Sequence, residues 1–195
     1  MRKKSHILLA RCLADHTWVN ELKSHRKAFC LGSILPDIRP SFLTTKHEFS
    51  VNYAQVERKI RTLTVENNLE EYNARVYWRQ LGEVTHHVAD YFTFPHNETF
   101  EGTLLEHGKY EAELKRNLKE TIKSGAADKY CQSTVKFDSL DELLTFLKTA
   151  HKIYVSRERN IKDDIQFIVT ICYQVMQGMI RIFQNRLQGL EVVMA

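Results

Sequence analysis

Turn-forming residues are scarce in this chain. Its 195 residues include only seven glycines and three prolines, against average usage of roughly 7% and 5%. Sandwiches, barrels and glycine-rich nucleotide loops need many such residues, so their scarcity argues against these architectures and favours long helices. We predict an all-α fold, with residues 1–195 forming a single multi-helix domain of about six helices.

Features of exported and membrane-spanning chains are also missing. Behind Met1-Arg-Lys-Lys the apolar stretch extends only from Ile7 to Ala10 before Arg11 interrupts it, which is too short for a signal peptide. The most apolar later stretch, residues 165–180, contains three glutamines, so we predict a buried helix and not a spanning one. We therefore expect a cytoplasmic protein with no transmembrane segment.

Clustered cysteines and one-sided charge are lacking as well. The four cysteines lie far apart without a Cys-x-x-Cys pair, so we expect neither a disulfide framework nor a thiolate zinc site. The 28 Lys and Arg residues and 24 Asp and Glu residues are spread over the chain, and the net charge is +4. This balance provides no strong nucleic-acid signature.

Apolar residues recur at helical spacing through most of the chain and predict where its helices lie. Ser5 is the expected N-cap of the first helix, and Ser139 to Glu142 reads as a capping box for a late one. The remaining expected helices cover residues 18–35, 51–64, 70–92, 101–122 and 161–187, and the expected loops are 36–50, with Pro36 and Pro40, 93–100 and 124–138.

Histidine is the outlier, with nine copies. Two expected helices each carry a ligand-type pair four residues apart, His86 with Asp90 and His107 with Glu111. Residues at this spacing share one helix face, so each pair can bind a single ion. Four further candidate ligands lie between or upstream of these pairs: His96, His6, Asp37 and His47.

The alternative interpretation of these pairs is structural. A single pair of this kind is more often a surface hydrogen bond or ion pair than a metal site. Two pairs on consecutive helices, beside apolar residues such as Val84 and Leu114, favour side chains that point inward and need partners there. Imidazole and carboxylate ligands without thiolate suit Zn²⁺ in open, hydrolytic sites. The pattern predicts a polynuclear zinc site and leaves the surface-pair alternative open.

Several segments between residue 5 and about residue 115 together resemble one known family. They are Ser5-His6-Ile-Leu-Leu-Ala-Arg, Gly32-Ser-Ile-Leu-Pro-Asp37, His47, Gly82-Glu-Val-Thr-His86-His-Val-Ala-Asp90-Tyr-Phe-Thr-Phe-Pro95-His96 and His107-Gly-Lys-Tyr-Glu111. In this order they resemble the zinc-dependent phospholipase C family, whose relatives include the S1/P1-type nucleases. The resemblance implies an all-α fold with a trinuclear zinc cleft. By this resemblance one zinc takes Asp37, His47, His86 and Asp90, a second takes His96, His107 and Glu111, and a third takes His6 and shares Asp90.

The third zinc of that family is also held by the N-terminal amine and carbonyl of a processed chain. Here five residues precede His6. Return of the Met1 amine to the same ion would require a tight reversal through Arg2-Lys3-Lys4, which contains neither Gly nor Pro and brings three cations close to a metal. We expect water or a borrowed carboxylate to complete this position instead.

The other histidines receive different predictions. His87 lies three residues from Asp90 and competes with His86, but the four-residue spacing and the family pattern favour His86 as the ligand. We expect His87 to support the ligands or to pack in the core. His16, His25 and His151 have no ligand-type neighbours that we recognise, and we expect them at the surface.

The resemblance implies hydrolysis of phosphodiester bonds, most directly phospholipase C-type cleavage of a phospholipid, with two to three Zn²⁺ ions as cofactor. Asp37 is the expected catalytic residue that orients or deprotonates the attacking water. Two alternatives stay open: an S1/P1-like nuclease or nucleotidase, and a metal-binding module without turnover. Five aromatic residues near the loops offer lipid or base contacts, although the core is their more common place: Phe42, Phe49, Tyr91, Phe92 and Phe94.

Overall fold

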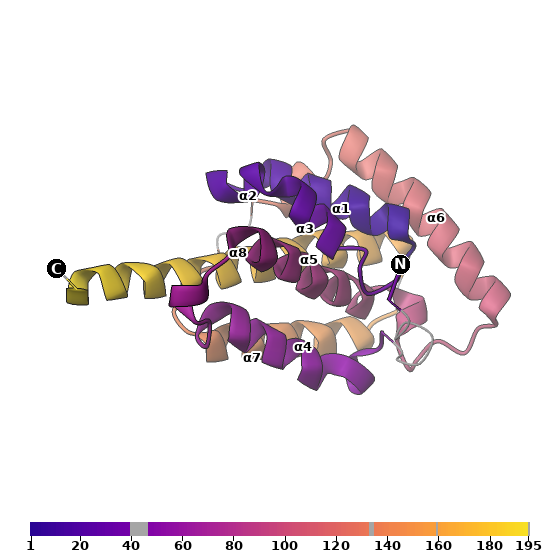
Figure 1. The fold of residues 1–195 in the computed structure, drawn as a ribbon. Helices are drawn as coiled ribbons and strands as arrows, with labels where there is room; N and C mark the ends of the chain where they lie inside the picture. Colours follow the sequence, from indigo (N-terminus) through magenta and orange to yellow (C-terminus); the bar gives the residue numbers. More distant parts are fainter. Residues whose placement is uncertain (40–46, 133–134, 159, 195) are drawn as a thin grey trace.

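Helix α5 (Ala74–Tyr91) lies at the centre of the fold and packs against α3 (Arg26–Gly32), α8 (Ile161–Met194), α4 (Phe49–Thr64) and α1 (Lys3–His16) (Figure 1). The computed structural model describes residues 1–39, 47–132, 135–158 and 160–194, with side chains through residue 189. These residues form α-helices and short 3-10 turns and contain no β-strand, so the predicted all-α fold is confirmed.

The described part of the chain contains eight α-helices, where about six were predicted. Residues 18–35, expected as one helix, form two short ones because the chain leaves helical geometry at His25. The helices not yet named are α2 (Asn20–Ser24), α6 (Leu104–Lys123) and α7 (Leu140–Val155), and the 3-10 turns include η2 (Leu69–Glu71), η3 (Phe94–His96) and η4 (Asp128–Tyr130).

Side-chain caps explain where several helices begin. Asn73 accepts a hydrogen bond from the backbone N–H of Val76, so α5 starts after η2 and not at the predicted residue 70. Ser139 caps α7 as predicted, but the predicted capping box is incomplete, because the Glu142 carboxylate accepts from the backbone N–H of Asp138 and not from that of Ser139. Ser5, in contrast, is wrong as an N-cap: α1 already begins at Lys3, and Ser5 is buried inside it.

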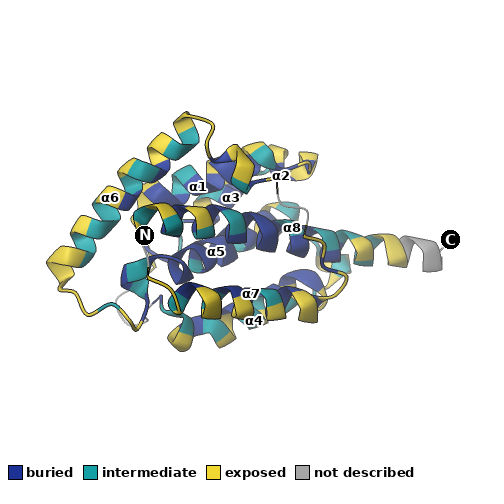
Figure 2. Cartoon of the chain, turned by 180° about the vertical axis from the view of Figure 1, so that it is seen from behind, coloured by how far each residue is buried: buried dark blue, intermediate teal, exposed yellow. Residues whose placement is uncertain are grey.

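Helix α8 is buried along most of its length. The segment Ile161–Gly189 is long and apolar enough to cross a membrane by length and composition, but 72% of its most apolar window is buried inside the fold. It packs against α5, α7, α4 and α6, and its exposed turns just before residue 189 already extend beyond the bundle (Figure 2). The prediction of a buried core helix is therefore confirmed.

Helices α3 and α5 touch backbone to backbone, because each has a glycine at the contact. A Cβ on Gly82 would lie 2.2 Å from the carbonyl oxygen of Phe29, and one on Gly32 would lie 1.9 Å from that of Arg79. No side chain fits at either position. The close approach places the end of α3 and the following loop, which carries Asp37, directly beside the central helix.

Candidate metal centre

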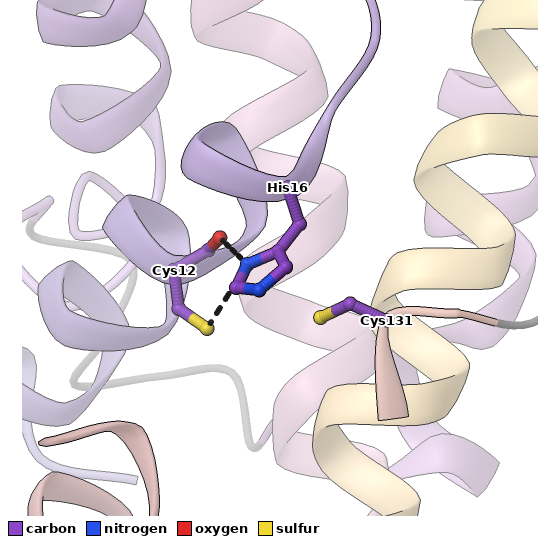
Figure 3. Close-up of side chains that lie close together, drawn as sticks. All are labelled: Cys12, His16 and Cys131. Atoms are coloured by element: carbon purple, nitrogen blue, oxygen red, sulfur yellow. Dashed lines mark hydrogen bonds between the residues drawn. The ribbon is translucent and has the colours of Figure 1, made fainter. Parts of the chain in front are cut away.

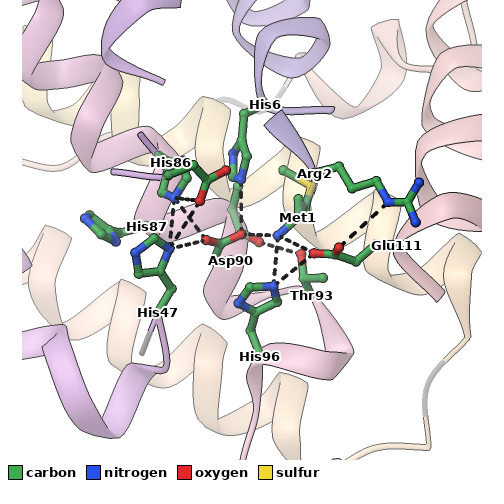
Figure 4. A network of polar contacts seen from close by, with 12 residues as sticks. Met1, Arg2, His6, His47, His86, His87, Asp90, Thr93, His96 and Glu111 are labelled. Carbon is green, nitrogen blue, oxygen red and sulfur yellow. Dashed lines mark hydrogen bonds and ion pairs between the residues drawn. The ribbon is translucent and has the colours of Figure 1, made fainter. Parts of the chain in front are cut away.

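The structure brings all eight predicted ligand residues together where α5 ends. They come from α1, the loop after α3, the segment just ahead of α4, α5, η3 and α6. Figure 4 shows six of them pointing toward one another. The loop prediction around Pro40 and the placement of Phe42 lie outside the described residues.

Asp90 lies at the centre of the cluster and is fully buried. Its Oδ2 is 3.1 Å from His47 Nδ1 and 3.1 Å from His86 Nε2. Its Oδ1 is 3.2 Å from His6 Nε2 on the other side. One carboxylate therefore faces two groups of imidazoles, which is the arrangement expected of a ligand that bridges two ions.

A backbone hydrogen bond orients His86. Its Nδ1–H donates to the carbonyl oxygen of Ser33 at 2.8 Å, so Nε2 carries the lone pair that faces the cluster. That Nε2 is 3.1 Å from His47 Nδ1 and 3.6 Å from Asp37 Oδ1. Asp37 Oδ1 is also 3.8 Å from His47 Nδ1. The four residues assigned by resemblance to one zinc thus converge on a common point.

A second group forms where η3 meets α6. Glu111 Oε1 is 3.3 Å from His96 Nε2 and 3.4 Å from His107 Nε2. The ligand atoms of these three residues all lie within 4.8 Å of one another. His107 and Glu111 share one face of α6, as their four-residue spacing predicts, and the proline-bearing turn η3 directs His96 toward them.

The surroundings of His6 fit a metal better than a hydrogen-bond network. Its ring is 1% exposed, and neither nitrogen has a hydrogen bond of acceptable geometry. Burial and the His86 ring, stacked at 3.8 Å, lower the pKa of His6 to about 3, so the imidazole is neutral and able to ligate. A buried imidazole without hydrogen bonds is costly unless a cation occupies the space beside it.

The Met1 amine lies inside the cluster, and the prediction that it stays away is wrong. Its nitrogen is 2.5 Å from Asp90 Oδ1, 3.0 Å from His96 Nε2 and 3.3 Å from Glu111 Oε1. The reversal that we considered unfavourable needs only one extended residue, Arg2, ahead of α1. The buried Met1 side chain anchors the segment in the core.

The cations of this segment lie at the edge of the cluster and face solvent, and the nearest of them, Arg2 Nε, is 3.9 Å from Glu111 Oε2. The Arg2 guanidinium donates to the carbonyl oxygen of Gly108 at 2.7 Å, and the side chains of Lys3 and Lys4 are exposed. The electrostatic objection to the reversal is therefore weak, because solvent screens the exposed lysines and Glu111 offsets the charge of Arg2.

The carboxylates of the cluster are kept ionised by their neighbours. Burial opposes ionisation of Asp90, but the Met1 amine and His96 outweigh it and hold the pKa of Asp90 well below its usual range. Glu111 behaves in the same way through hydrogen bonds from His107 and His96, which lower its pKa. Asp37 differs, because burial raises its pKa. The cluster thus has two firmly anionic centres and one carboxylate that takes up a proton more readily.

The remaining histidines divide into three cases. His87 Nδ1 accepts a hydrogen bond from the Asn52 amide at 3.2 Å, and its ring packs edge-on against His47, as expected of a supporting residue. His151 is not a simple surface residue, since its ring stacks on Phe49 at 4.0 Å. The prediction that His16 lacks ligand-type neighbours is wrong, because two cysteines lie beside it.

The cluster forms the floor of an open cleft with a volume of about 1190 Å³. Five predicted ligands line it together with Met1: Asp37, His47, His96, His107 and Glu111. Two of the aromatic residues considered for ligand contacts, Tyr91 and Phe92, are fully buried and belong to the core.

This all-helical arrangement of imidazoles and carboxylates around a cleft has the donor set of a metal-binding site. Residues 5–161 match the family described as zinc dependent phospholipase C, and the chain belongs to this family. The match continues about 45 residues beyond the motifs that carry the resemblance, which end near residue 115, and it includes all of α7. No curated protein and no solved structure matches the chain.

Proposed function

We propose that this protein hydrolyses the phosphodiester bond of a phospholipid headgroup, using zinc ions held by the eight predicted ligands. The observation that carries the proposal is the placement of this ligand cluster on the floor of a cleft that also has a basic side and an apolar rim. Phospholipids combine an anionic phosphodiester with apolar chains, and the cleft offers complementary groups for both.

The basic side of the cleft suits a phosphate. Arg2, Lys3, Lys4 and Lys115 line it, and the three residues next to Met1 have exposed side chains. Cations beside a phosphoryl group raise the local concentration of an anionic substrate and stabilise the additional negative charge that develops during its hydrolysis.

The rim suits a lipid surface. Leu104 and Leu105 begin α6 and are 88% and 67% exposed, and Leu104 lines the cleft together with Phe100. Two adjacent, largely exposed leucines beside a cleft are typical of a surface that contacts a partner or a lipid. Their position at the cleft mouth places them where acyl chains emerge when a headgroup occupies the floor.

Asp37 is the residue proposed to handle the proton of the attacking water. It lines the cleft beside His47 and His86, and its raised pKa makes it a better proton acceptor than the two anionic carboxylates. When bound, zinc would supply Lewis acidity toward the phosphoryl oxygens and lower the pKa of water. Burial lowers the pKa of His6 and His96, which favours their neutral, ligating form, and the Ser33 carbonyl orients His86.

Three substrates test the proposal: phosphatidylcholine micelles, a soluble chromogenic phosphodiester and single-stranded DNA, each with zinc-loaded and metal-free protein. We expect metal-dependent cleavage of the first two and little cleavage of DNA. Preference for DNA would instead establish the nuclease alternative, and zinc binding without any turnover would establish the metal-binding module.

The leucine rim is tested separately. Leu104→Ser combined with Leu105→Ser should lower the ratio of micelle activity to soluble-substrate activity several-fold. Trp18→Ala is the matched control, because Trp18 is 58% exposed and lies just beyond the opposite end of α1 from the cleft. An unchanged ratio in the leucine variant would argue against lipid contact by this rim.

A further inference from the structure

A second cluster of metal-ligating side chains lies at the far end of α1 from the cleft. Cys12 and His16 are one turn apart on this helix, and Cys131 directly follows the turn η4. One ligand atom from each of the three lies within 4.8 Å of the others. Figure 3 shows the His16 ring between the two thiol groups. None of these residues contributes to the cluster around Asp90.

The hydrogen bonds of His16 leave one ring nitrogen facing a second acceptor. Nδ1 is 2.8 Å from the carbonyl oxygen of Cys12, which can only accept, so Nδ1 carries a hydrogen. Nε2 is 3.0 Å from Asp128 Oδ1. A nitrogen lone pair and a carboxylate oxygen at this distance require a cation between them, either a proton or a metal ion. Histidines that bind metal commonly donate their other N–H to a backbone carbonyl in this way.

The donor set has the composition of a closed zinc site. Two sulfurs, one imidazole nitrogen and one carboxylate oxygen make four ligands, and thiolates select zinc over the harder divalent cations. Zinc bonds of about 2.3 Å to sulfur and about 2.0 Å to nitrogen separate tetrahedral ligands by roughly 3.5 Å. The ligand atoms of Cys12, His16 and Cys131 already lie within 4.8 Å of one another, and Asp128 Oδ1 is 3.0 Å from His16 Nε2, so side-chain rotations would bring the ligands to this spacing.

The two cysteines of the cluster are buried, whereas His16 and Asp128 are partly exposed to solvent. Cys12 is 3% and Cys131 5% exposed, so the sulfurs lie on the inner side of the cluster. The side chains of His16 and Asp128 are 28% and 58% exposed and face solvent, which gives an ion a path of entry. Cys131 belongs to the connection between α6 and α7, whose described residues form no helix longer than η4.

We propose that Cys12, His16, Cys131 and Asp128 form a second, structural zinc site that ties the α6–α7 connection to α1. The site holds the end of α1 that is opposite to His6. It is independent of the catalytic proposal, because no residue is shared between the two centres. An ion here links segments more than a hundred residues apart and stabilises only the folded chain.

Cobalt(II) substitution tests the proposal on the whole, reduced protein. Thiolate bound to cobalt gives a strong sulfur-to-metal charge-transfer absorption in the near ultraviolet, which imidazole and carboxylate ligands do not give. The eight ligands of the first centre include no cysteine, so this band reports on the second site alone. We expect the band to appear during titration of the wild-type protein with cobalt. At saturation its intensity should correspond to one thiolate-bound cobalt ion per chain. Absence of the band in folded, reduced protein would overturn the proposal.

Matched variants assign the ligands. Cys12→Ser and Cys131→Ser should each abolish or strongly weaken the band, while Cys30→Ser should retain it, since Cys30 lies on α3 outside the cluster. His16→Gln should shift the band, whereas His25→Gln should leave it unchanged. His25 makes the same hydrogen bond to the carbonyl four residues earlier, Glu21, at 3.0 Å, so it controls for that bond alone.

A test that needs no variant covers the case in which a substitution prevents folding. Zinc added to the reduced wild-type protein should slow alkylation of Cys12 and Cys131, read by peptide mass spectrometry, at least tenfold relative to Cys30. Equal rates with and without zinc would overturn the proposal. The protein could instead be isolated with a Cys12–Cys131 disulfide. If zinc still failed to protect the two cysteines from alkylation after that disulfide is reduced, the pair would be a redox pair and the proposal would be overturned.

Discussion

Replacement of Gly82 by alanine tests whether the contact between α3 and α5 positions the metal centre. The added Cβ would lie 2.2 Å from the Phe29 carbonyl oxygen and 2.9 Å from the Ser33 nitrogen. Both are backbone atoms and cannot rotate away, so the two helices must separate by about 1 Å. Overpacking of this kind costs about 1–3 kcal/mol, and we expect the upper end of that range here.

The helix propensity of alanine offsets part of this cost. Gly→Ala inside a helix stabilises by about 1 kcal/mol, so the expected net loss for Gly82→Ala is about 2 kcal/mol. Gly189→Ala is the matched control, because a Cβ there meets nothing within 4 Å, and it should stabilise by about 0.5–1 kcal/mol. Urea denaturation of metal-free protein measures both values.

The same substitution should weaken zinc binding beyond its effect on stability. Separation of the helices moves the Ser33 carbonyl, which holds His86 Nδ1 at 2.8 Å, and shifts Asp37 away from His47. We expect at least a tenfold loss of affinity for one zinc ion in calorimetric titration. A variant that is as stable as the wild type and binds zinc equally well would refute the reasoning.

Three further predictions concern the centre and its support. Purified protein should hold at least two zinc ions at the first centre, and Asp90→Asn should reduce this zinc content more than any other single substitution. A chelator should lower the melting temperature by several degrees, because a ligand at a hundredfold excess over its Kd stabilises the folded state by about 2.7 kcal/mol. Placing two residues ahead of Met1 should displace its amine from Asp90 and Glu111 and weaken one zinc ion while two remain. Glu83→Gln should destabilise metal-free protein by about 1–2 kcal/mol at pH 7, because the nearly buried carboxylate is paired with Arg39 and Lys59. Burial opposes ionisation of Glu83, but these hydrogen bonds outweigh it and lower its pKa below 4.5, so its contribution is present above about pH 4.5 and is lost as the pH falls through the lowered pKa.

Each of these predictions has a contradicting result. Elemental analysis below one zinc per chain, or a melting curve unaffected by chelator, would identify the ligands as ordinary polar contacts. Three ions held equally well by the extended protein would show that the Met1 amine is no ligand. Glu57→Gln is the control for Glu83→Gln, since Glu57 also pairs with two cations, Arg61 and Lys148, but is more exposed and should change stability by less than about 0.5 kcal/mol. Equal losses in both variants would contradict the importance of the buried pair.

The helices and the ligand pairs were predictable because both depend on local spacing. Val56 and Ile60, one turn apart, turn the same face of α4 into the core. For the same reason His86 with Asp90 and His107 with Glu111 each share a helix face whatever the helices pack against. Cys12 and His16 have the same four-residue spacing, and this signal was available, but a single pair without a third partner nearby in the sequence does not indicate a metal site.

Tertiary structure alone decided which distant groups complete each centre. Cys131 reaches Cys12 through the packing of the α6–α7 connection, and no sequence spacing encodes that contact. The Met1 amine enters the first centre because one extended residue and a buried methionine side chain reverse the chain, which residue composition did not suggest. Gly32 and Gly82 belong to recognisable motifs, yet only the contact between α3 and α5 explains them. Local spacing determines which side chains share a face, whereas the long-range packing of helices determines which faces meet.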